Sequence, residues 1–139
     1  MNSLNRFADP VYCIVRVVFG LIYACHGGQK LLAFPGGGHG VAGIAFVAGI
    51  IELIGGFLIA FGLFARLAAF LASGEMAVAY FIFYVGEMPT WQAKFFPIMN
   101  GGELAVLYCW FFFFIIFYGP GRWSVEALWR KEKNSVASS

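Results

Sequence analysis

The stretch "AGIIELIGGFLIAFG", residues Ala48 to Gly62, holds a single carboxylate, Glu52, among residues that are otherwise apolar or small. Together with the residues just before it, this run is long enough to cross the hydrocarbon core of a bilayer. Hydrophobic residues make up 61% of the 139-residue chain and charged residues only 12%. That charged share is about half of the value typical of soluble domains. Length and composition therefore predict one integral membrane domain.

Apolar runs of this kind occur four times, and clusters of proline and glycine separate them. They cover about residues 10–32, 41–62, 66–85 and 98–118. We therefore predict an all-α fold, an integral membrane four-helix bundle with antiparallel up-down topology. The membrane domain would cover residues 1–122. Residues 123–139 would form an interfacial segment followed by a disordered C-terminal tail.

Basic residues are distributed unequally between the two ends of this predicted bundle. One end holds Lys30 and Lys94. The other end holds Arg6, Arg66, Arg122, Arg130, Lys131 and Lys133. Positively charged loops stay in the cytoplasm, so this distribution predicts both termini on the cytoplasmic side. The net charge of +2 and the lack of a basic, aromatic-rich cluster exclude nucleic acid as an expected partner.

Helical spacing places the charged residues of three spans on stripes of small residues. The stripes are Tyr12, Arg16, Gly20, Tyr23, Gly27 and Lys30; then Ala45, Gly49, Glu52, Gly56 and Ala60; then Ala68, Ala72, Glu75 and Ala79. Small residues let membrane helices approach closely. These faces are therefore predicted to point into the bundle and to carry the glutamates with them.

A rise of about 1.5 Å per residue predicts two polar layers inside the bundle. The inner layer would join Arg16 with Glu52 and Glu75. The outer layer would comprise His26, Gln29, Asn100 and Glu103. Each ionised residue at the centre of a span costs about 2.5–3.5 kcal/mol, so these groups must be paired, protonated or hydrated. Two interpretations stay open: a functional site, or a polar network that only fixes helix register.

The residue pattern assigns no catalytic residue and no metal site. A di-iron bundle would need a histidine three residues after the glutamates, where this chain has Gly55, Val78 and Val106. A haem would have to be shared with a partner subunit, because His26 alone lies in a span and His39 lies in a glycine-rich loop.

A quinone site would need aromatic walls, a hydrogen-bond donor and a proton acceptor within the bilayer. Tyr23, His26, Trp110 and Glu103 are the candidate cofactor-binding residues of this kind. The alternative for the aromatic run "YCWFFFFIIFY" is that it faces lipid and neighbouring chains.

Four motifs, in their order and spacing, resemble the DoxX family of small bacterial membrane proteins. They are "RVVFGLIYACHGGQKLL", "IIELIGGFLIAFGLFAR", "MAVAYF" and "NGGELAVLYCWFFFFIIFYGPGRWSVE". The resemblance covers about residues 11 to 126. The family's recurring positions fall on Arg16, His26, Gly27, Lys30, Glu52, Gly55, Gly56, Gly62, Arg66, Asn100, Gly101, Gly102, Glu103, Gly119, Pro120 and Gly121.

The resemblance implies a four-helix membrane domain that is often associated with redox enzymes, one relative being a subunit of a thiosulfate:quinone oxidoreductase. We therefore expect a small subunit of a redox or electron-transfer system in the bacterial inner (cytoplasmic) membrane, supporting quinone binding or proton movement. The alternative is a non-catalytic structural or assembly subunit of a larger membrane complex. Expected partners are the lipid bilayer and other membrane subunits, with a homo-oligomer left open. Whether the chain is itself catalytic also stays open.

Overall fold

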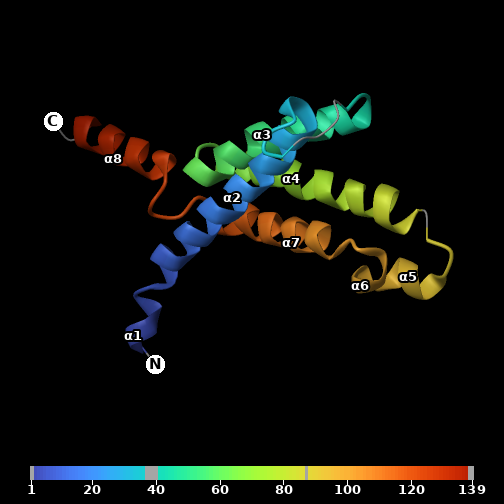
Figure 1. Ribbon diagram of the computed structural model, residues 1–139. Coiled ribbons are helices and arrows are strands. Elements are labelled where there is room, and N and C mark those ends of the chain that lie inside the picture. The colour runs from blue at the N-terminus through green and yellow to red at the C-terminus, as the bar shows by residue number, and fades with distance from the viewer. Residues whose placement is uncertain (1, 37–40, 87, 138–139) are drawn as a thin grey trace.

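The computed structural model describes residues 2–36, 41–86 and 88–137, and every regular element in these ranges is a helix (Figure 1). His39, in the glycine-rich loop, lies outside the described residues. The elements in chain order are α1 (Asn2–Asn5), α2 (Ala8–Leu32), α3 (Ile44–Phe61), α4 (Ala65–Ala79), the π-helix η1 (Tyr80–Val85), α5 (Trp91–Phe95), α6 (Pro97–Asn100), α7 (Glu103–Tyr118) and α8 (Val125–Ala137).

Three helical stretches are long and apolar enough to cross a membrane. These are α2, α3 and the continuous stretch of α4 and η1, with 25, 18 and 21 residues. The fourth apolar helix, α7, has 16 residues. The predicted class, an all-helical multi-pass membrane protein, is thereby confirmed, whereas the number of four spans and their topology stay predictions.

The fourth helix is shorter than the predicted span of residues 98–118 because the chain breaks at Gly101. This glycine has φ +75°, a left-handed conformation that ends α6. Asn100 stabilises the break, since its Oδ1 accepts a hydrogen bond from the Gly102 N–H at 2.8 Å. Glu103 therefore lies in the first turn of α7, where the helix dipole favours a carboxylate, and is exposed.

Helices α2 and α3 pack through their backbones along two of the predicted stripes. A Cβ atom added at Gly56 would lie 2.5 Å from the Ala24 amide nitrogen, and one at Gly27 would lie 2.3 Å from the Leu53 amide nitrogen. Both distances are too short for any side chain. The glycines are therefore required for this helix pair, as small residues are at close helix crossings in membranes.

Helices α4 and α7 pack through side chains instead. Ala68 and Ala72 of α4 and Phe112 of α7 belong to one buried cluster, which Tyr23 of α2 and Ile59 of α3 also join. The small side chains of α4 leave room for the aromatic rings of α7. One buried core thus connects the two helix pairs and fixes their relative position.

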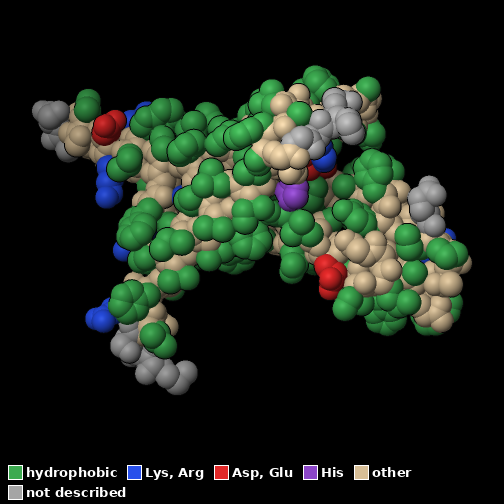
Figure 2. Space-filling model, in the orientation of Figure 1, with side chains coloured by type: hydrophobic (Ala, Val, Ile, Leu, Met, Phe, Trp, Pro, Cys, Tyr) green, Lys and Arg blue, Asp and Glu red, His purple; other side chains and the backbone are tan. Residues whose placement is uncertain are grey.

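Large apolar side chains cover much of the visible face, and most of the visible basic side chains lie on the side that holds α1 and α8 (Figure 1, Figure 2). Phe70, Trp110 and Phe117 are 62%, 67% and 68% exposed. Aromatic side chains exposed on this scale are typical of a surface that faces lipid rather than water.

Helix α8 leads away from the other helices (Figure 1). Ser124 precedes it and caps it, because its Oγ accepts a hydrogen bond from the Ala127 N–H at 3.2 Å. We predicted a disordered tail after the interfacial segment, but the structure continues the helix through Ala137. Residues 138–139 lie outside the described ranges.

Candidate functional site

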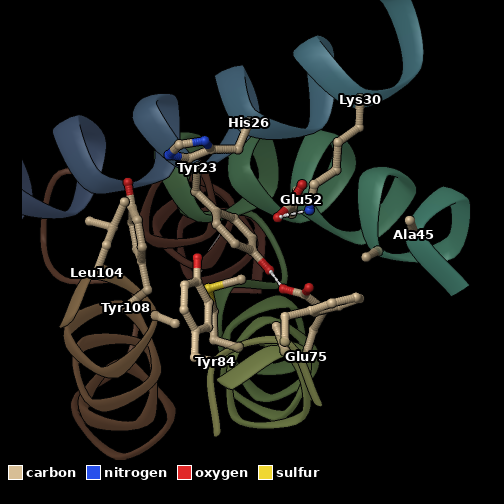
Figure 3. Close-up of a pocket in the computed structure, with 14 residues that line it drawn as sticks. Tyr23, His26, Lys30, Ala45, Glu52, Glu75, Tyr84, Leu104 and Tyr108 are labelled. Atoms are coloured by element: carbon tan, nitrogen blue, oxygen red, sulfur yellow. Dashed lines mark hydrogen bonds and ion pairs between the residues drawn. The ribbon is translucent and has the colours of Figure 1, made fainter. Parts of the chain in front are cut away.

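A cavity of about 370 Å³ lies among α2, α3, α4, η1 and α7 (Figure 3). Its volume falls within the range of small-molecule sites, about 300–1,000 Å³. Most of the wall is apolar. The polar and charged lining residues are Tyr23, His26, Lys30, Glu52, Glu75, Tyr84 and Tyr108.

The first interaction in this cavity is an ion pair between Lys30 and Glu52. The Lys30 Nζ lies 2.7 Å from Glu52 Oε1, and the two side chains are 34% and 3% exposed. Lys30 occupies the last turn of α2, whereas Glu52 lies near the middle of α3. The second oxygen, Glu52 Oε2, is buried and has no hydrogen-bond partner among the described residues. The pair therefore leaves a buried acceptor unsatisfied.

The second interaction joins α2 to α4. The Tyr23 hydroxyl donates a hydrogen bond to Glu75 Oε2 at 2.8 Å, and Tyr23 itself is fully buried. Figure 3 shows Glu52 and Glu75 pointing toward a common space from α3 and α4, with the Tyr23 ring beside them. Two carboxylates thus face one cavity, and the single lysine pairs with one of them.

Aromatic side chains close the remaining sides of the cavity. His26 packs edge-on against Tyr108, with ring centroids 6.2 Å apart and an interplanar angle of 89°. Phe83 and Tyr84 come from the π-helix η1, where the wider turn shifts the side chains from the register of α4. Helical segments of this type are frequent at functional sites.

Arg16 does not join this cavity, which corrects the predicted inner layer. Its guanidinium is fully buried and donates to backbone carbonyls: to Ile59, to Ala60 at 2.9 Å and to Trp123 at 2.7 Å. No hydrogen bond or ion pair joins Arg16 to Glu52 or Glu75. The physical reason is that the last carbonyls of a helix lack partners within the helix, and α3 ends beside Arg16.

The residues of the predicted outer layer do not form a cluster. His26 lines the cavity. Gln29 is exposed and donates to the Pro35 carbonyl at 3.0 Å. Asn100 donates to the Tyr80 hydroxyl at 3.2 Å and so holds the connection before α7.

The four candidate quinone-binding residues are likewise divided by the structure. Tyr23 and His26 line the cavity, while Glu103 and Trp110 are exposed outside it. Sequence reasoning missed Tyr108, because almost every residue of α7 is apolar and the spacing marks no buried face. Positions Ala105, Tyr108, Phe112 and Ile115 repeat at steps of three and four and all are buried.

This arrangement supports hydrogen bonding and proton exchange with a small ligand. Tyrosine hydroxyls, an imidazole, an ammonium and two carboxylates supply both donors and acceptors. Within the described ranges, no three His, Cys, Asp or Glu side chains gather closely enough to hold a metal ion.

Comparison with known proteins identifies relatives of this chain. The sequence profile of the family described as DoxX matches residues 11–85. An uncharacterized protein of Haemophilus influenzae is 40% identical over 131 residues, which cover 91% of this chain and 96% of that protein. No solved structure matches the chain. The matched residues 11–85 include both polar pairs of the cavity, Lys30 with Glu52 and Tyr23 with Glu75.

Proposed function

The chain belongs to the DoxX family of membrane proteins, and from this premise we propose that it is a redox-associated subunit that binds a quinone head group in the cavity and exchanges protons with it. The proposed setting is the bacterial inner membrane, with four spans and both termini in the cytoplasm. At about 1.5 Å per residue, the 16-residue α7 is about 24 Å long, which covers most of a hydrocarbon core of about 30 Å.

The observation that carries this proposal is the unpartnered Glu52 Oε2 in the wall of a mostly apolar cavity. A buried acceptor without a partner costs about 1–3 kcal/mol, more when the group is charged. A ligand that supplies the missing hydrogen bond would remove this cost. The apolar and aromatic wall, including Met76, Phe83 and Leu104, suits a flat ring.

Filling the cavity tests this proposal. Ala48 lines the cavity, and its neighbour Val47 is 54% exposed on the outer face of the same helix. We expect Ala48→Phe to weaken binding of a short-chain quinone and its hydroquinone at least about tenfold, because the added ring occupies the ligand's space. Val47→Phe should bind as the unmodified protein does. Anaerobic titration calorimetry in detergent measures both variants, and equal affinity in the two would contradict the proposal.

A second candidate function is that of a structural or assembly subunit. The exposed aromatic ridge of α7, formed by Trp110, Phe113 and Phe117, favours it, because this ridge could pack against a larger membrane protein. Native purification in mild detergent would then retain a partner. Substituting Trp110 and Phe117 with leucine would release that partner and leave quinone binding unchanged.

A further inference from the structure

We infer that the Glu52–Glu75 end of the cavity recognises a hydrogen-bond donor on its ligand, an O–H or N–H group, and discriminates against a carbonyl oxygen of the same size. This inference rests on the proposed function. For a quinone ligand it means that the reduced dihydroxy form binds more tightly than the oxidised form.

The acceptors at this end of the cavity come from three helices. Glu52 Oε1 is occupied by the Lys30 ammonium, and Glu52 Oε2 is unpartnered. Glu75 Oε2 accepts a hydrogen bond from the Tyr23 hydroxyl, so the Tyr23 oxygen can only accept further hydrogen bonds. The Glu52 carboxylate, which is paired with the Lys30 ammonium, also accepts only. A ligand atom placed beside Glu52 Oε2 and the Tyr23 oxygen therefore meets acceptors.

No donor among the described residues reaches Glu52 Oε2, although donors do line the cavity. The Lys30 ammonium directs one of its three N–H groups to Glu52 Oε1 at 2.7 Å. The His26 imidazole packs against Tyr108. Figure 3 shows Tyr108 on the side of the cavity away from Glu52, and Tyr84 between Tyr108 and Glu75. A tyrosine hydroxyl donates or accepts equally well, so it does not distinguish a carbonyl from a hydroxyl.

The consequence for ligand selection follows from the cost of unpaired polar groups. A carbonyl oxygen opposite Glu52 Oε2 would leave both acceptors without a partner. Sites built to hydrogen-bond a substrate O–H reject analogues that lack it more strongly than apolar pockets reject a change of size. A single hydrogen bond to a charged group corresponds to about a 10- to 100-fold difference in affinity.

A matched pair of probes tests this inference: a short-chain benzoquinone and its hydroquinone, titrated anaerobically into the detergent-solubilised protein. We expect the hydroquinone to bind about 10- to 100-fold more tightly. Glu52→Gln should reduce this ratio to about threefold or less, because the amide offers a donor as well as an acceptor. Glu103→Gln removes an exposed carboxylate outside the cavity and should keep the original ratio.

Because Glu52→Gln leaves Lys30 without its carboxylate, the double variant with Lys30→Met provides a second test without an unpaired ammonium, and it too should lose the preference. Equal or tighter binding of the quinone by the unmodified protein would overturn this inference and leave the proposed function standing. A preference that survives both Glu52 variants would also overturn it. Failure of both probes to bind the unmodified protein would overturn the proposed function and the inference together.

Discussion

In the helix pair α2–α3 and in the helix pair α4–α7, the same kind of contact joins one helix to the C-terminal end of the other. In each pair an arginine of the first helix donates to the last carbonyls of the second: Arg16 to Ile59 and Ala60, and Arg66 to Ile116 and Phe117. A glycine with positive φ follows each second helix, Gly62 at +67° and Gly119 at +91°. A Cβ atom at either glycine would lie 2.8 Å from a guanidinium nitrogen.

The two pairs differ in the surroundings of this arginine contact. Arg16 is fully buried and holds a third carbonyl, that of Trp123, whereas Arg66 is exposed. The first pair packs backbone against backbone and carries the Lys30–Glu52 ion pair. The second packs alanines against aromatic rings. The comparison teaches that the same contact, an arginine bound to helix-end carbonyls, occurs both as a buried contact in the helix pair that carries an ion pair and as an exposed contact in the pair rich in aromatic rings.

Replacing the two arginines should give the largest difference between the pairs. Arg16→Met should lower the free energy of unfolding by about 2–4 kcal/mol, because the buried Ala60 carbonyl and the partly buried Trp123 carbonyl lose their donor. Arg66→Met should cost about 1 kcal/mol or less, since water can reach the carbonyls it contacts. Thermal unfolding in detergent measures both. Equal losses of unfolding free energy in the two variants would show that burial does not distinguish the two arginine contacts.

Adjacent glycines of α3 test the backbone packing of the first pair. Gly56→Ala should destabilise by about 1–3 kcal/mol, because its Cβ would meet the backbone of Ala24 at 2.5 Å. Gly55→Ala meets nothing within 4 Å and should instead stabilise by about 0.5–1 kcal/mol through helix propensity. The same unfolding assay compares them, and a destabilised Gly55→Ala would argue against this packing.

The ion pair of the first half should show strong coupling. Lys30→Met should cost about 1–2 kcal/mol, because it leaves Glu52 buried without its cation, although Lys30 is itself partly exposed. The double variant with Glu52→Met should be no less stable than Lys30→Met alone, since apolar replacement of a buried pair is often neutral. A double-mutant cycle measures the coupling, and additive losses would contradict it.

The smallest effect is expected in the second half. Ser73 donates to the Cys109 carbonyl at 2.9 Å and so joins α4 to α7. Ser73→Ala should cost about 0.5–1 kcal/mol, the net value of one neutral hydrogen bond. Thermal unfolding of Ser73→Ala and Lys30→Met, measured under the same conditions, compares the two helix pairs. A larger loss of unfolding free energy in Ser73→Ala than in Lys30→Met would contradict the expected order.

The sequence predicted the features that depend on local spacing. The helical class, the apolar spans and the glycine stripes of α2 and α3 follow from composition and from the 3.6-residue period. The partner of Arg16 could not be predicted, because helix-end carbonyls are backbone atoms and leave no mark in the residue pattern. Lys30 lies on the same stripe as Arg16, fourteen residues later, and it is Lys30 that reaches Glu52.

The parts of the site contributed by η1 and α7 were less accessible to sequence reasoning. Glu103 was predicted to be buried because the run of residues 98–118 looks continuous, but the left-handed Gly101 breaks it. Tyr84 lines the cavity from η1, and the residue pattern does not reveal that this segment departs from α-helical register. Which helices face one another across a bundle also depends on tertiary packing, so the meeting of His26 with Tyr108 was not visible beforehand.

The glycine contacts between α2 and α3 also determine where the protein can accommodate a larger molecule. Backbones that touch at Gly20, Gly27 and Gly56 cannot move closer, and separating them would expose their polar groups to lipid. A bulkier ring substituent must therefore displace the Met76 and Phe83 side of the cavity. These two side chains should accordingly determine which ring substituents the cavity accepts, because the wall formed by α2 and α3 cannot move.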